Sequence, residues 1–339
     1  MPLFALLTLG PLVPVALGAL LGGAWPWVAF AWITVLTATL DEAGRRADPG
    51  EGREFPGSDL LLAAVAVGML GTLALAVRAL AGDGLGPWGK LGLFLAVSWW
   101  CGQVANAASH ELVHRPSRPL RRLGAAAYAA LLFGHHASAH PLVHHVHVAT
   151  RRDPSTARLG EGFWRFMGRA WRGSFRKGLA AESERLARAG RPRWRHPYGG
   201  YVALSLLAVG VAFGLGGLAG VAWHFGIAWV ASVQLLLSDY VQHYGLERAR
   251  RADGRAEPFG ARHAWNSPHR ASGALLLNAP RHSDHHARPA VPYPALRLPP
   301  EAEAPRLPAS LPAMATLALC PPLWRRVMDG RARAWLAQG

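Results

Sequence analysis

Apolar residues in this chain are gathered in long blocks rather than alternating with polar ones. A helix needs about 20 apolar residues to cross the hydrocarbon core of a bilayer, and blocks of nearly that length recur along the chain. They predict about six membrane-spanning helices, at residues 3–21, 25–40, 59–81, 90–108, 201–218 and 221–241. The pattern is typical of an all-α, polytopic membrane protein, and we expect residues 1–339 to form one domain.

Two segments between these blocks have a different character. Residues 120–133 are apolar but span only about 14 positions, which is too short to cross the membrane and predicts a re-entrant or interfacial helix. Residues 150–197 are rich in arginine and carry aromatic residues at partly helical spacing, as amphipathic helices on a membrane surface do. We expect residues 115–198 and 243–339 to form a cap at one end of the spans.

Basic residues exceed acidic ones, with 36 Lys and Arg against 20 Asp and Glu and a net charge of +16. Such a charge can indicate nucleic-acid binding, but the chain has no nucleic-acid motif and no aromatic residues interleaved for base stacking. The basic residues instead flank apolar blocks, mainly in the loops 41–57 and 115–198. The positive-inside rule places these loops in the cytoplasm, so we expect a multi-pass protein of the inner (plasma) membrane with both termini in the cytoplasm.

Cysteine is scarce, with Cys101 and Cys320 as the two cysteines of the chain. A rubredoxin-type iron or a ferredoxin cluster needs four thiolates. If the protein uses one-electron chemistry, its electron carrier must therefore be a separate protein.

Histidines cluster where apolar blocks meet polar sequence. His110 and His114 are four residues apart at the end of the fourth predicted span, so they share a helix face and can bind one metal ion. Similar spacing recurs twice, and one more histidine follows the last span at the same depth: His140, His144 and His145; His282, His285 and His286; and His243.

Neutral imidazoles suit iron, copper or zinc, whereas magnesium and calcium require oxygen ligands. A structural zinc site uses four ligands, so eight or nine histidines indicate two metal ions. Histidines on helices at the bilayer surface suit an oxygen-activating enzyme whose apolar substrate enters from the lipid. The alternative outside enzymes is a metal transporter, but transport needs polar groups along a path through the membrane, and the predicted spans contain almost no ionisable residues.

The histidines belong to longer motifs: HELVHR at 110–115, HPLVHH at 140–145 followed by VAT at 148–150 and DP at 153–154, HYGL at 243–246, WNS at 265–267 and RHSDHHA at 281–287. On these motifs, from about residue 30 to residue 329, the chain resembles the membrane-bound alkane 1-monooxygenases. That family lies within the integral-membrane di-iron superfamily of fatty-acid desaturases and hydroxylases. RHSDHHA and HYGL favour the alkane branch over ordinary desaturases.

The resemblance implies a non-haem di-iron enzyme that uses O2 to hydroxylate the terminal methyl group of a medium or long alkane. Electrons would come from a rubredoxin, which is reduced by an NADH-dependent reductase. Related enzymes that hydroxylate methyl-substituted aromatics or desaturate fatty acyl chains with the same site remain the alternative. The implied catalytic iron ligands are His110, His114, His140, His144, His145, His243, His282, His285 and His286.

Four positions beside these motifs depart from the family pattern: Ala139, Val143, Asp239 and Gln242. The family usually has Glu, Gly, Asn and Glu there, respectively. Carboxylates that orient metal-bound imidazoles are normally among such positions. The remaining candidates for that role are Glu111, Asp153, Asp239 and Asp284.

Large side chains on the second predicted span are candidates for limiting the depth to which an alkyl chain penetrates. Trp27 and Trp32 have the required size and position. The alternative is that both tryptophans are anchors at the membrane interface.

Overall fold

The computed structural model describes residues 1–338, and this range is helical without a β-strand. Regular helices alternate with short π and 3-10 turns. In chain order they are α1 (Pro2–Leu9), α2 (Leu12–Leu21), α3 (Trp25–Ala31), η1 (Trp32–Leu36), α4 (Thr37–Ala43), α5 (Ser58–Ala81), α6 (Pro87–Trp100), η2 (Cys101–Ala105), α7 (Asn106–His114), α8 (Arg118–Ala130), α9 (His136–Ala139), η3 (His140–His144), α10 (His145–His147), α11 (Phe163–Arg188), η4 (Arg193–Arg195), α12 (Pro197–His243), η5 (Ala261–His263), α13 (Arg270–Leu275), α14 (His282–Ala287), η6 (Tyr293–Ala295), α15 (Leu311–Ala318) and α16 (Pro321–Leu336). The all-α prediction is confirmed.

Within residues 1–338, four helical stretches are long and apolar enough to cross a membrane: Pro2–Leu21, Ser58–Ala81, Pro87–His114 and Pro197–His243. They contain five of the six predicted spans, because the last stretch holds both 201–218 and 221–241. The predicted span 25–40 is helical through α3, η1 and α4 but is not one of these four. The chain is a membrane protein.

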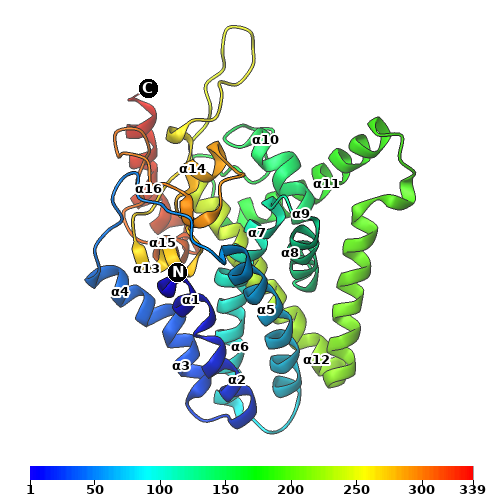
Figure 1. The fold of residues 1–339 in the computed structure, drawn as a ribbon. Helices are drawn as coiled ribbons and strands as arrows, with labels where there is room; N and C mark the ends of the chain where they lie inside the picture. Colours follow the sequence, from blue (N-terminus) through cyan, green and yellow to red (C-terminus); the bar gives the residue numbers. More distant parts are fainter. Residues whose placement is uncertain (339) are drawn as a thin grey trace.

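The long helix α12 folds back on itself near its middle (Figure 1). Gly217 has φ +57° and ψ −146°, a conformation that glycine adopts without a steric penalty. A Cβ atom at Gly220 would lie 2.3 Å from the carbonyl oxygen of Ala212, so glycine also lets the two arms approach closely. The second arm ends at His243 and brings that ring back toward the cap.

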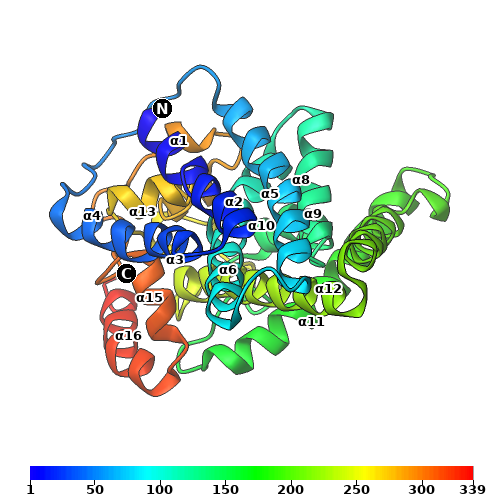
Figure 2. The same ribbon diagram turned by 90° about the horizontal axis from the view of Figure 1, so that it is seen from below.

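Helix α6 lies near the centre of the apolar end of the molecule. It contacts α2, α3, α5 and α12, which surround it in the view from below (Figure 2). Trp100, at the end of α6, is fully buried and donates its indole N–H to the carbonyl oxygen of Thr8 at 2.8 Å. This packing places the continuation of α6, through η2 and α7, at the entrance to the cap.

Helices α9 to α11 and α13 to α16 form the cap at the other end of the spans (Figure 1). A second apolar core lies there, distinct from the core among the spans, and contains Tyr240, Tyr244 and Trp324. The predicted short segment 120–133 forms α8, which packs against α5, α7 and α12. The predicted surface helices include α11, which has arginine along its exposed side.

Candidate metal centre

The nine predicted histidines come together where the spans meet the cap. They form two groups, and within each group the candidate ligand atoms lie within 4.8 Å of one another. The first group is His110, His114, His140, His145 and His285, and the second is His144, His243, His282 and His286. The structure thus joins the end of α7, the η3–α10 segment, the end of α12 and α14 around one centre.

Within each group, Nε2 atoms of different histidines lie close to one another. In the first group, Nε2 of His145 lies 2.9 Å from Nε2 of His140 and 3.2 Å from Nε2 of His285. In the second, Nε2 of His282 lies 2.9 Å from Nε2 of His243. Two nitrogens at about 2.1 Å from one metal ion, seen at a right angle, are about 3.0 Å apart. The spacing therefore fits metal ligation.

One pair of histidines differs from the sequence prediction. Helical spacing predicts that His140 and His144, four residues apart, bind one ion, but they lie in different groups. The reason is that residues 140–144 form a π-helical turn, which contains Pro141 and therefore lacks one N–H donor. The wider turn brings His145, five residues on, beside His140. The pairs His110 with His114 and His282 with His286 do stay together, as helical spacing predicts.

His144 is oriented by a carboxylate. Its Nδ1 lies 2.9 Å from Oδ2 of Asp153, which also accepts a hydrogen bond from the Thr156 hydroxyl at 2.6 Å. This leaves Nε2 with a free lone pair, and within residues 1–338 that buried atom has no hydrogen-bond partner. Burial lowers the pKa of His144, but the charge and hydrogen bond of Asp153 outweigh burial and raise that pKa above its usual value. Asp153 therefore favours a ring that carries a proton or a metal ion.

The other cap histidines have the opposite electrostatic setting. Burial first, and neighbouring imidazoles second, lower the pKa of His140, His145, His282, His285 and His286 well below the usual value. These rings are neutral near pH 7. A neutral imidazole is the form that binds a metal ion.

Glu111 lies beside the first group. Its Oε1 is 3.8 Å from Nδ1 of His110 and 3.9 Å from Nδ1 of His285, which is longer than a hydrogen bond. Its Oε2 accepts a hydrogen bond from the backbone N–H of Tyr293 at 3.2 Å and lies 3.7 Å from the guanidinium of Arg115. Glu111 therefore lies beside the two rings without a direct hydrogen bond to either of them.

The remaining two carboxylates differ from each other. Asp284 pairs with Arg288 at 2.6 Å and accepts the backbone N–H of Arg297 at 2.7 Å, and it bonds to no histidine within residues 1–338. The prediction that it orients an imidazole is therefore wrong. Asp239 is buried, and its Oδ2 has no hydrogen-bond partner in the described chain.

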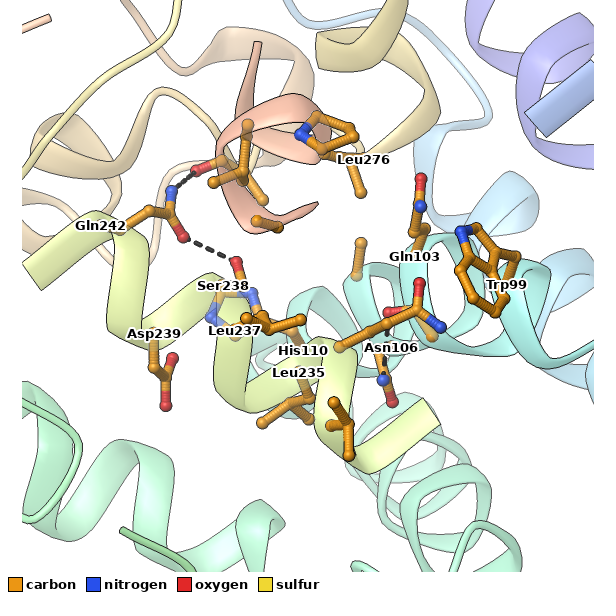
Figure 3. Close-up of a pocket in the computed structure, with 18 of the residues that line it drawn as sticks. Trp99, Gln103, Asn106, His110, Leu235, Leu237, Ser238, Asp239, Gln242 and Leu276 are labelled. Atoms are coloured by element: carbon orange, nitrogen blue, oxygen red, sulfur yellow. Dashed lines mark hydrogen bonds between the residues drawn. The ribbon is translucent and has the colours of Figure 1, made fainter. Parts of the chain in front are cut away.

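A cavity of about 330 Å³ extends from the two histidine groups into the spans (Figure 3). His110 of the first group and His282 of the second both line it. The walls come from α6, η2, α7, the second arm of α12 and α15, and they are mostly apolar. The size is at the lower end of ordinary ligand pockets, which run from roughly 300 to 1,000 Å³.

Comparison with known proteins shows the family to which a chain with this site belongs. Residues 85–318 match the family model described as fatty acid desaturase. The chain belongs to the fatty acid desaturase family. Alkane 1-monooxygenase 2 of Pseudomonas aeruginosa is 35% identical over 95% of this chain and 88% of its own length. Alkane 1-monooxygenase 1 of the same organism is 36% identical, over 82% and 73% respectively.

A third relative has a different name. The xylene/toluene monooxygenase hydroxylase component of Pseudomonas putida is 30% identical over 91% of this chain and 82% of its own length. The resemblance to alkane 1-monooxygenases, within the desaturase family, is confirmed. The chain is accordingly a membrane-bound monooxygenase-type oxidoreductase of this family with a histidine-rich metal centre.

In this member of the desaturase family the cavity is not lined by the tryptophans that the sequence singled out. Trp27 packs against Phe30 and Gly92, and Trp32 lies against Gly10. Three other tryptophans line the cavity instead: Trp99, Trp164 and Trp229.

The sequence did contain a signal for this wall of the cavity. Four residues on one face of the span lead from its middle to the metal centre: Trp99, Gln103, Asn106 and His110. Their spacing of four, three and four residues is that of one helix face. Helical spacing from His110 toward the N-terminus identifies Asn106, Gln103 and Trp99 as residues on the same face.

Proposed function

We propose that the chain hydroxylates the terminal methyl group of a medium or long alkane to a primary alcohol, using O2, at a di-iron centre. Its metal ligands would be the nine histidines of the two groups, five for one ion and four for the other. The observation that carries the proposal is the cavity, because an apolar space in the membrane part of the chain reaches His110 of one group and His282 of the other.

Iron at these positions would supply the activation of O2, and the chain's own residues would place the substrate. Apolar side chains such as Leu235, Leu237 and Leu276 line the cavity and would hold an alkyl chain while excluding water. Asp153 fixes the orientation of His144, and the carboxyl group of Glu111 lies beside His110. One oxygen atom of O2 would enter the C–H bond, and the other would leave as water with two electrons and two protons.

The electrons would come from a rubredoxin and its NADH-dependent reductase. The two cysteines, Cys101 and Cys320, cannot form a four-thiolate site. Half-buried His145 is followed by exposed Val146, and the guanidinium of Arg248 donates to the Val146 carbonyl oxygen at 3.3 Å. Exposed Arg151 and its neighbours add positive charge to this region, which favours docking of a negatively charged carrier protein.

The orientation that we propose is a multi-pass protein of the inner membrane with the metal centre and both termini in the cytoplasm, all within one domain over residues 1–339. The support is the concentration of basic residues in the cap segments. The first helix also starts at the cap end, because Phe4 packs edge-to-face against Tyr293 at 5.2 Å between ring centroids.

A second candidate substrate is a methyl-substituted aromatic ring. The observation in its favour is the similarity to the xylene/toluene monooxygenase component, which covers nearly as much of the chain as the first alkane relative does. The same histidines and the same cavity would serve, and the difference would lie in the placement of the methyl group.

The test is conversion of octane, hexadecane, a xylene and a fatty acyl substrate by membranes that contain the protein, supplied with rubredoxin, reductase, NADH and O2. A terminal alcohol from an alkane, absent with His285→Ala, is the expected result. An aromatic alcohol or an alkene instead would contradict the alkane assignment. Iron content per chain, measured on purified protein, tests the two ions separately, and a value near one would refute the di-iron centre.

A further inference from the structure

Gln103 lines the cavity without a partner for its amide. It lies in the membrane span Pro87–His114, its Oε1 is buried without a hydrogen-bond partner within residues 1–338, and no bond to its Nε2 is found there either. An unpaired amide in apolar surroundings is destabilising, so proteins pair such groups unless a ligand supplies the missing bonds. Gln103 also lies in the π-helical turn Cys101–Ala105, and such turns inside helices are frequent at functional sites.

Two neighbouring amides offer oxygen atoms to the same cavity. The side-chain amide of Asn106 donates its N–H groups to the carbonyl oxygens of Gly102 at 3.1 Å and Ala231 at 2.9 Å. The amide of Gln234 donates to the carbonyl oxygen of Ser98 at 3.0 Å. These bonds fix which end of each amide is the donor, and within residues 1–338 no donor bonds to either side-chain oxygen.

The position of Gln234 depends on a glycine. A Cβ atom on Gly102 would lie 2.3 Å from Nε2 of Gln234, so the absence of a side chain lets this amide lie flat against the wall. By contrast, Gln242, also in the cavity lining, has both ends bonded, to Ser238 at 2.8 Å and to the carbonyl oxygen of Ala279 at 2.9 Å. Gln242 is thus a structural amide, whereas Gln103 is not.

Gln103 and Asn106 lie at known distances along the helix from His110. Gln103 is seven residues before His110 on the same helix face, which corresponds to about 10 Å along the axis at 1.5 Å per residue. Asn106 lies between them, one turn from His110 (Figure 3). A polar group of a bound chain can therefore meet Gln103 while the far end of that chain lies at the metal centre.

We propose that the preferred substrate carries a hydroxyl group about 10 Å from the methyl carbon that reacts, and that Gln103 hydrogen-bonds this hydroxyl with help from Gln234. A hydroxyl both donates and accepts, which matches the free capacity of the amides. The substrate class is a medium-chain primary alcohol and the product is a diol with a hydroxyl at each end. This inference rests on the proposed hydroxylation, and it adds the primary alcohol to the alkane as a second substrate class, which the chain prefers.

The reaction balances as the alkane reaction does. A terminal C–H bond is replaced by C–O–H, one oxygen atom of O2 enters the product, and the other leaves as water. Two electrons from the one-electron carrier and two protons from water complete the step. The hydroxyl already on the substrate is unchanged, because it is held at Gln103 away from His110 and His282.

The experiment compares a series of primary alcohols, from hexanol to dodecanol, with the matching alkanes in the reconstituted membrane assay. For the wild-type chain we expect kcat/KM for the best alcohol to exceed that for its alkane by about tenfold or more, with a diol as product. Gln103→Met keeps the volume and removes the amide, and it should lower this ratio by about tenfold. Gln338→Met, at an exposed position outside the cavity, should leave the ratio unchanged.

Three outcomes would overturn the inference. They are an alkane preferred over every alcohol, an aldehyde formed at the original hydroxyl in place of a diol, and an equal ratio in Gln103→Met and the wild type. If alkanes react while alcohols do not, the proposed function stands and this inference fails.

Binding tests the inference even if no substrate is turned over. Added octanol should raise the Tm of the purified wild-type protein in detergent more than it raises that of Gln103→Met, because a ligand stabilises the state that binds it. Octane should raise both to a similar extent. Equal shifts with octanol would refute the role of Gln103, whereas absent turnover with a clear difference in shift would count against the hydroxylation alone.

Discussion

Replacing Asp153 with asparagine should weaken iron binding without unfolding the cap. Asp153→Asn keeps the shape of the side chain but removes the charge that stabilises His144 through the 2.9 Å contact at Nδ1. The amide NH2 would also replace one of the two carboxylate oxygens. It would then face either the Thr156 hydroxyl, which now donates to Oδ2 at 2.6 Å, or the Ser155 N–H, which now donates to Oδ1 at 3.0 Å. A hydrogen bond to a charged group contributes about 1.5–3 kcal/mol, and the loss of about 2 kcal/mol corresponds to roughly thirtyfold in an equilibrium constant.

We therefore expect an iron dissociation constant about 10 to 100 times higher in Asp153→Asn, as for other partners of metal-bound histidines. The assay is competition between the purified protein and a chelator of known affinity. Asp284→Asn is the matched control, because Asp284 sits among the histidines of α14 in sequence but bonds to Arg288 and Arg297. Equal iron affinity in Asp153→Asn and the wild type would refute the reasoning, as would an equal loss in Asp284→Asn.

Three further outcomes follow from the described contacts. Removal of the metal by a chelator should lower the Tm, because the buried imidazoles would lose their shared ligand, and calorimetry with and without added iron measures the shift. Gly217→Ala should destabilise the chain by about 1 kcal/mol or more, because alanine is strained at φ +57°. Gly214→Ala, in the regular helix, should not destabilise it, and chemical unfolding of both variants measures the difference. Trp99→Ala should shift activity toward longer substrate chains, because Trp99 lines the cavity, whereas Trp88→Ala, at a side chain that is 74% exposed, should not. An unchanged product profile in Trp99→Ala would show that this side chain does not limit the cavity.

The sequence by itself determined the membrane spans and the presence of a histidine-rich centre. Apolar blocks of bilayer length specify spanning helices whatever their neighbours are, because the bilayer leaves the backbone few alternatives. Helical spacing also fixed local pairs, so His110 with His114 and His282 with His286 stay together in the structure. Both inferences depend on properties of one helix at a time.

The tertiary structure decided which helix faces meet. Adjacent His144 and His145 enter different groups, because a π-helical turn rotates the chain between His140 and His145 in a way that ideal spacing does not predict. Asp153 orients an imidazole while Asp284, inside a histidine motif, pairs with an arginine.

The cavity also depends partly on the sequence of single helices and partly on how those helices pack. One wall runs along a helix face that includes Trp99 and Gln103. The adjoining wall comes from residues more than a hundred positions later in the chain, on the second arm of α12. Periodicity identifies each face, but only the packing of α6 and α7 against α12 decides that these faces enclose a space, since helix packing depends on side chains from distant segments.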